Sequence, residues 1–318
     1  MLVFMLYDWR KKPETESGAS QPLLPDDATS TLIKGNPRLI ELQTRYATFN
    51  DHVTTPLIWT ADYVSPADMV YFRGDNAYVW QLRGTNMHPV AYTLTTYYIK
   101  SIDKLGLLDK LQEDSYFGSY VYPVDNRLVS RDLLDSILEL YFLETHLQLS
   151  AVENLTVLDI GAGYGRLAHR LVIAFPNCVD YLCTDAFAPS TFIADYYLRF
   201  RNLEGKARSV PLYEIEKTLR AHSIDIAVNI HSFSECQLPA IEWWLSLLQA
   251  NQVKYLMVVP NAKDHGGTHL QTNAGKDFGT LIEKYGYTLI AKEPKYKDPV
   301  VQKYAINPTY YYLFAFQS

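Results

Sequence analysis

The sequence has few cysteines, no cluster of lysines and arginines, and no hydrophobic run long enough to cross a membrane. Its three cysteines, Cys178, Cys183 and Cys236, fit neither a disulfide framework nor a zinc knuckle, so we expect a reducing, cytoplasmic environment. A net charge of -6 without a basic cluster disfavours nucleic acid as a partner. Residues 1–6 are apolar but too short for a secretory signal, and we expect no membrane partner.

The most informative stretch is 155–165, which reads Leu-Thr-Val-Leu-Asp-Ile-Gly-Ala-Gly-Tyr-Gly. Its β-branched and aliphatic first half predicts a strand covered on both faces. The glycines at 161, 163 and 165 predict a tight turn whose backbone approaches a ligand closely. Residues 166–175 follow with helical spacing of their apolar side chains. A strand, glycine loop and helix in this order begin a nucleotide-binding βαβ unit.

The residues around this loop restrict which class of ligand can bind there. A dinucleotide fingerprint needs a third glycine at the position of Arg166. Asp159 stands just before the loop, where it would repel a pyrophosphate and attract a cation. Asp185 ends the next predicted strand, about 20 residues beyond the loop, where it can accept hydrogen bonds from a ribose diol. These features suit S-adenosylmethionine, a ribosylated ligand with a cationic amino-acid end.

At these residues the sequence resembles the class I S-adenosylmethionine-dependent methyltransferases, with 157–165 as their first motif and Asp185 as their second-strand acid. The resemblance implies an α/β fold with a Rossmann-like seven-stranded sheet whose last strand is antiparallel. We predict strands at 156–160, 180–185, 207–211, 224–230, 253–259, 287–293 and 310–316.

The chain divides into three predicted parts. Residues 1–30 are polar and proline-rich and read as a flexible segment. Residues 31–125 form a mainly helical accessory or lid region, in which we predict one helix over 94–108. Residues 126–318 form the cofactor-binding methyltransferase domain, which begins with a strong helix over 130–143.

Aromatic residues are dense in the accessory region, and flat rings with polar tips suit the stacking of sugars. The alternative is that these rings form the region's own core. If the region is a substrate lid, its best segment is 71–80, and the candidate substrate-binding residues are Tyr71, Arg73, Tyr78 and Trp80.

Ligands bind at the carboxyl ends of strands in an open parallel sheet, so we expect the loops after four strands to surround one crevice. The predicted cofactor-binding residues are Asp159, Gly161, Ala162, Gly163, Tyr164, Gly165, Asp185, Ala186, Phe187, Asn229, Ile230 and His231.

A hydroxyl acceptor needs a base as the new bond forms, and histidine is the usual base near neutral pH. His231 follows the fourth predicted strand, and Glu235 is a candidate to orient it. His265 is the competing base, and Asp264 and His269 of the same loop are candidate substrate contacts. These residues predict no metal-binding set, although the need for a divalent cation is left open.

Three further segments look like the sugar O-methyltransferase family found near glycan and glycosylated natural-product genes. They are 130–136, 229–235 with the Trp243-Trp244 pair, and 293–299. The resemblance implies O-methylation of a sugar or glycosylated small molecule. A phenolic, peptide or other natural-product acceptor is an alternative, and so is a cofactor-binding module without turnover. Whether the chain forms a homo-oligomer is left open.

Overall fold

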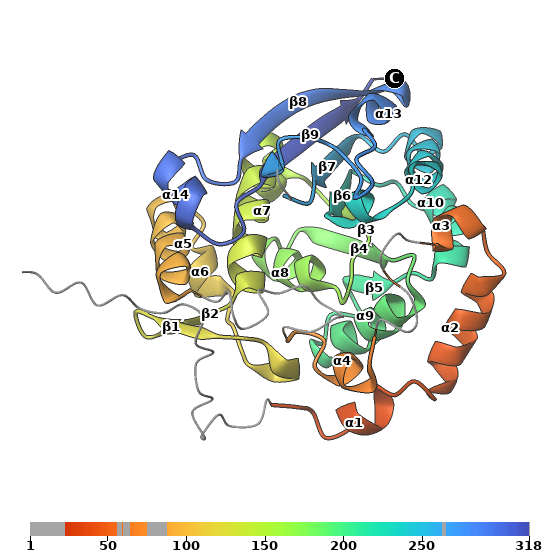
Figure 1. The fold of residues 1–318 in the computed structure, drawn as a ribbon, viewed down its shortest axis with the longest axis horizontal. Coiled ribbons are helices and arrows are strands. Elements are labelled where there is room, and N and C mark those ends of the chain that lie inside the picture. Colours follow the sequence, from red (N-terminus) through yellow and green to blue (C-terminus); the bar gives the residue numbers. More distant parts are fainter. Residues whose placement is uncertain (1–22, 56–58, 60–63, 75–87, 263–264, 318) are drawn as a thin grey trace, which may run out of the picture.

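The structure is a computed structural model that describes residues 23–55, 59, 64–74, 88–262 and 265–317. Its centre is a seven-stranded sheet in the order β5-β4-β3-β6-β7-β9-β8 (Figure 1). The strands are β3 (Leu155–Ile160), β4 (Cys178–Thr184), β5 (Ala207–Ser209), β6 (Ile226–Ile230), β7 (Tyr255–Val259), β8 (Tyr287–Pro294) and β9 (Tyr310–Phe316). β9 is antiparallel to both β7 and β8, and the pairs from β5 to β7 are parallel. The predicted Rossmann-like fold and antiparallel last strand are therefore confirmed.

Helices surround this sheet and also make up most of the described N-terminal region. The first six are α1 (Ala28–Thr31), α2 (Pro37–Ala47), α3 (Asp51–Thr54), α4 (Pro66–Val70), α5 (Pro89–Ile102) and α6 (Leu107–Lys110). The later ones are α7 (Arg131–Leu147), α8 (Arg166–Ala174), α9 (Ala188–Phe200), α10 (Ile215–Ala221), α11 (Ser232–Glu235), α12 (Leu238–Ala250), α13 (Gly279–Lys284) and α14 (Pro299–Tyr304). A short hairpin, β1 (Tyr122–Val124) with β2 (Arg127–Val129), precedes α7 and was not predicted.

The predicted single helix over 94–108 is wrong, because the helical conformation is interrupted between Ile102 and Leu107. α5 ends at Ile102, and Gly106 adopts a left-handed conformation with φ of 65°. The Asp103 carboxylate then accepts hydrogen bonds from the backbone N–H groups of Leu107 and Leu108, at 2.7 and 3.0 Å. This cap satisfies donors at the start of α6, so a second helix begins there.

Two hydrophobic clusters cover the sheet and join it to the N-terminal helices. One collects side chains from α1, α2, α9, α10, α12 and α13 around alternate residues of β3, including Leu158 and Ile160. The other collects α5, α6, α7, α8 and α14 around Leu155 and Val157. α14 lies beside α5, at the opposite side of the molecule from α2 (Figure 1). The accessory helices therefore share their core with the sheet.

The structure offers no candidate for a membrane span among the helices of its described residues, because none of them combines sufficient length with sufficient hydropathy.

Candidate functional site

The glycine loop joins the carboxyl ends of β3 and β4. The N–H groups of Gly161 and Ala162 donate to the carbonyl of Thr184, at 2.9 and 3.1 Å. Gly161 has a φ of +77°, and a Cβ at this position would lie 2.2 Å from the Ser232 hydroxyl. Only glycine fits there. At Gly163, with φ of +57°, an added Cβ would meet no described atom within 4 Å, so the loop presents bare backbone to open space.

Asp185 holds the loop from the side of β4. One carboxylate oxygen accepts from the Phe187 N–H at 2.8 Å, and the other accepts from the Gly163 N–H at 3.1 Å. Burial raises the pKa of Asp185 to about 6, against the opposing effect of these two donors. The carboxylate is half-buried and is mostly charged at neutral pH. The Ser190 side chain also hydrogen-bonds this carboxylate, so about one of its four lone pairs stays available for a further donor.

Asp159 lies beneath the same loop and is only 3% exposed. The Tyr181 hydroxyl donates to it at 2.9 Å. Burial nevertheless raises the pKa of Asp159 to about 7. A carboxyl group with a raised pKa in the folded state lowers the free energy of unfolding at any pH at which the unfolded chain would ionise it.

Asp159→Asn is therefore expected to stabilise the ligand-free protein at alkaline pH. The folded state holds a proton that the unfolded state releases near the ordinary pKa of 3.8, so the wild type loses stability as the pH rises from about 4 to 7. The loss is on the order of 4 kcal/mol. Urea unfolding from pH 5 to 8 measures it: the gap between Asp159→Asn and wild type should widen with pH. The exposed control Glu204→Gln should show a constant gap, and parallel curves for Asp159→Asn would contradict the expectation.

Hydrogen bonds join the loops after β3, β6 and β7. The Asn229 amide donates to the Ile160 carbonyl at 2.9 Å and to the Ser232 hydroxyl at 3.1 Å, and its oxygen accepts from the Phe233 N–H. The Ser234 hydroxyl accepts from the Asn261 N–H at 3.0 Å. Asn229 is fully buried, so its predicted direct contact with the cofactor is wrong. Its side chain instead holds these loops together.

Tyr164 also needs a correction. Its ring is 4% exposed and packs against Phe72 and Tyr197, and its hydroxyl donates to Asp132 of α7. The side chain therefore belongs to the core rather than to a cofactor pocket. The remaining predicted cofactor residues Ala162, Ala186, Phe187 and Ile230 are half-buried around the same loops, and Gly165 precedes α8 with a φ of +86°. Their contacts with a cofactor stay predictions.

His231 occupies the end of β6 in a conformation that is rare for a residue with a side chain, with φ of 68°. Its N–H donates to the Val259 carbonyl at 2.7 Å. Burial, reinforced by the nearby Arg131 guanidinium, lowers the pKa of His231 to about 3, so the imidazole is neutral at physiological pH. Its Nδ1 has no hydrogen-bond partner among the described residues.

Glu235 does not orient His231, contrary to expectation. Its carboxylate oxygens accept from the Trp59 indole N–H at 2.8 Å and from the Asn261 amide at 3.3 Å. The Trp59 ring lies 6.0 Å from that of Phe187. An aromatic residue of the accessory region thus reaches two of the loops of the predicted crevice.

His265 and His269 pair with each other in the loop after β7. Their rings are 5.4 Å apart at 74°. His265 is half-buried and His269 is exposed, while Asp264 lies outside the described residues. His265 therefore stays a predicted candidate base.

The predicted substrate lid is only partly described. Tyr78 and Trp80 lie outside the described residues, and Tyr71 is half-buried. Arg73 is fully buried and forms ion pairs with Glu113 at 2.6 Å and with Asp114 at 2.7 Å. Its predicted role as a substrate contact is wrong, because its guanidinium anchors the accessory region internally.

A polar layer between α7 and the strand ends was missed by the sequence reasoning. On α7, Asp135 binds Arg131 at 3.1 Å and also Lys295, which follows β8. Arg166 binds Glu139 at 2.8 Å. We call these five residues the polar layer. The available signal was the acids at 132, 135 and 139 among the leucines and isoleucine of this helix, since buried charges require partners. The layer joins two segments, 130–136 and 293–299, that carried the finer family resemblance.

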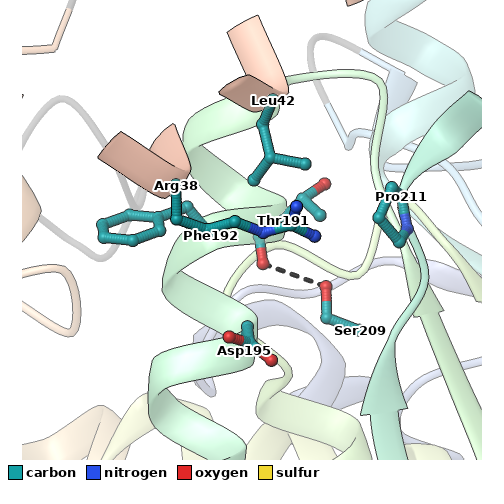
Figure 2. Close-up of a pocket in the computed structure, with 7 residues that line it drawn as sticks. All are labelled: Arg38, Leu42, Thr191, Phe192, Asp195, Ser209 and Pro211. Atoms are coloured by element: carbon teal, nitrogen blue, oxygen red, sulfur yellow. Dashed lines mark hydrogen bonds between the residues drawn. The ribbon is translucent and has the colours of Figure 1, made fainter. Parts of the chain in front are cut away.

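No three His, Cys, Asp or Glu side chains among the described residues are grouped closely enough to hold a metal ion. A small hollow lies between α2, α9 and the end of β5, with a hydrogen bond of 2.9 Å from the Ser209 hydroxyl to the Thr191 carbonyl inside it (Figure 2). It holds about 20 Å³, room for a water molecule. It is not a substrate site.

No protein-family model matches the chain, and no curated protein matches it. Solved structures with a similar fold include the (4+2)-cyclase SpnF, at 16% identity over 71% of this chain and 93% of that chain, with a TM-score of 0.41. The mitomycin 7-O-methyltransferase MmcR is 17% identical over 58% of this chain and 57% of that chain, with a TM-score of 0.39. Magnesium protoporphyrin IX methyltransferase from Synechocystis is 12% identical over 72% of this chain and 95% of that chain, with a TM-score of 0.42. Similarities this low do not indicate a function, so any proposal about function must rest on the residues of the site.

Proposed function

We propose that this chain is an S-adenosylmethionine-dependent methyltransferase that acts on a hydroxyl of a sugar or glycosylated small molecule. The observation that carries the proposal is the Asp185 carboxylate, held against the bare glycine loop by the N–H groups of Gly163 and Phe187. A carboxylate with a lone pair to spare can accept a hydrogen bond from a ribose hydroxyl. The open backbone at Gly163 fits a ligand that approaches closely.

A dinucleotide fits this site less well. The position of a third glycine holds Arg166, whose guanidinium is bound to Glu139 and Ser136 of α7. A buried carboxyl, Asp159, also lies under the loop where a pyrophosphate would bring further negative charge. Asp185 and the backbone of 161–165 would hold the cofactor, with Asp159 beneath them.

When bound, S-adenosylmethionine supplies an electrophilic methyl group, and its thioether leaves without needing a proton. The chain must align the acceptor and remove its proton. We propose that the neutral Nδ1 of His231 accepts that proton. Its low pKa makes it a weak base, but a hydroxyl proton becomes strongly acidic once its oxygen has begun to bond to carbon. A weak base then suffices.

Cofactor binding is the direct test. S-adenosylhomocysteine should bind the wild type in preference to NAD by calorimetry, and Asp185→Asn should weaken binding by about 1.5–3 kcal/mol through loss of charge-assisted hydrogen bonds. Because the pKa of Asp185 is about 6, affinity should fall about tenfold between pH 7 and pH 5, as the carboxylate gains a proton.

The matched control is Asp195→Asn, which alters an exposed carboxylate on α9 that pairs with Arg199. It should leave the affinity and its pH dependence unchanged. Absence of S-adenosylhomocysteine binding, or tighter binding of NAD, would refute the proposal. The alternative of a cofactor-binding module without turnover predicts a different result. The protein would bind S-adenosylhomocysteine, but it would not convert S-adenosylmethionine to S-adenosylhomocysteine with any hydroxyl acceptor.

A further inference from the structure

Two buried polar groups near the end of β7 lack hydrogen-bond partners within the described part of the chain. They are Nδ1 of His231 and the hydroxyl of Tyr311. Tyr311 is only 3% exposed. Buried polar groups are normally paired, and leaving one unpaired costs stability. Two such groups in one region therefore call for a ligand that pairs with both.

The strand register brings these two residues close together. His231 follows β6, and its N–H donates to the Val259 carbonyl at the end of β7. On the other side of β7, Tyr312 of β9 pairs with Val258, which puts Tyr311 beside Val259. Two strand spacings separate the backbones of His231 and Tyr311, about 10 Å. Both side chains can therefore reach one ligand.

Both side chains also face α7. The Tyr311 ring packs against Phe142 at 5.2 Å. The charged groups that act on the His231 imidazole include Arg131 and Asp135 at the start of the same helix. The two unpaired groups thus lie against the polar layer.

The charged side chains of the polar layer form ion pairs with one another. Asp135 pairs with Arg131 and Lys295, and Arg166 pairs with Glu139. The Lys295 ammonium also donates to the carbonyls of Ile306 and Asn307, at 3.1 and 3.2 Å. A charged acceptor group would disturb these pairs, whereas a hydroxyl would not. The layer reaches solvent at Arg131 and Arg166, whose side chains are 15% and 18% exposed.

We propose that His231 and Tyr311 bind two hydroxyls of an uncharged acceptor at the polar layer. The inference rests on the proposed function and deepens it. His231 accepts a hydrogen bond from the hydroxyl to be methylated, and Tyr311 binds a neighbouring hydroxyl. Tyr311 is thus the residue that selects which hydroxyl is presented to His231.

The test compares Tyr311→Phe with Tyr310→Phe, its neighbour on β9, which is half-buried and lies near Lys292. Saturation-transfer NMR on the enzyme loaded with S-adenosylhomocysteine measures binding of methyl glucopyranoside and methyl rhamnopyranoside. Glucosamine and a glucose phosphate serve as charged counterparts. We expect a neutral glycoside to bind the wild type and the charged sugars to bind more weakly. Tyr311→Phe should weaken glycoside binding about tenfold, and Tyr310→Phe should not.

A second readout is the melting temperature of the ligand-free protein. Removing an unpaired buried hydroxyl should raise it by a few degrees in Tyr311→Phe. Unchanged glycoside affinity in this variant, or no glycoside binding to the loaded wild type, overturns the inference while the cofactor proposal stands. Weakened S-adenosylhomocysteine binding in Tyr311→Phe would assign the hydroxyl to the cofactor and also overturn it. If the wild type binds no S-adenosylhomocysteine, the proposed function fails, and the inference fails with it.

Discussion

His231→Ala should lower the rate of methyl transfer by about 10²–10⁴-fold, the usual contribution of a positioned general base. The affinity for S-adenosylhomocysteine should stay within about twofold, because Asp185 and the glycine loop supply the cofactor contacts we propose. Release of S-adenosylhomocysteine at saturating cofactor, with the glycoside that binds best, measures the rate. The pKa of about 3 adds a second expectation: His231 remains neutral from pH 8 to 5, so it produces no loss of rate in that range.

The control for this experiment is His222→Ala, which removes an exposed imidazole directly after α10 and should change the rate little. If His265→Ala abolishes turnover while His231→Ala retains most of it, the base belongs to the loop after β7. If neither variant matters but a chelator does, a metal ion activates the hydroxyl and no histidine is the base.

Arg73→Met should lower the free energy of unfolding by about 3–5 kcal/mol, because removing one partner of a buried ion pair leaves the others without compensation. Glu113 is as fully buried as Arg73, and the guanidinium also binds Asp114. Urea unfolding measures the loss. In the variant, Arg170 retains one hydrogen bond to Glu113 and Arg201 retains two to Asp114, which puts the expectation toward the lower end of the range.

Arg38→Met is the matched control for this loss. Arg38 pairs with Glu41 at 2.7 Å, but both side chains are about half exposed. Such surface pairs contribute about 0–1 kcal/mol. If Arg73→Met unfolds at the urea concentration of the wild type and instead raises the KM for the acceptor, Arg73 contacts substrate after all.

The central sheet could be predicted from the sequence because its signals are local. The stretch 155–165 contains the strand, the turn and the start of the helix within one short segment, and the structure matches it. The glycines were informative for a steric reason, since Ser232 occupies the space of a Cβ at Gly161. The start of the predicted helix at residue 130 is also fixed locally, because the Ser130 hydroxyl accepts from the Leu133 N–H at 3.0 Å.

The roles of individual polar residues could not be predicted in the same way, because their partners are remote in sequence. Arg73 was predicted to be a lid residue, but the carboxylates that bind its guanidinium, Glu113 and Asp114, lie 40 and 41 residues further along the chain. Lys295 meets Asp135 across 160 residues. Glu235 looked close enough to orient His231, but Trp59 and Asn261 bind it instead. Burial and pairing decide what a charged side chain does, and both depend on the assembled fold.

The position of β9 also affects how the protein is made. β9 is the last strand in sequence, yet it lies between β7 and β8 and pairs with both. While the ribosome is still translating 310–316, β7 has an open edge of the kind that pairs with other chains. A chain in which β9 has not yet paired therefore exposes a strand edge that favours aggregation. Since β9 carries Tyr311, its insertion closes the sheet and supplies the acceptor-binding hydroxyl in the same step.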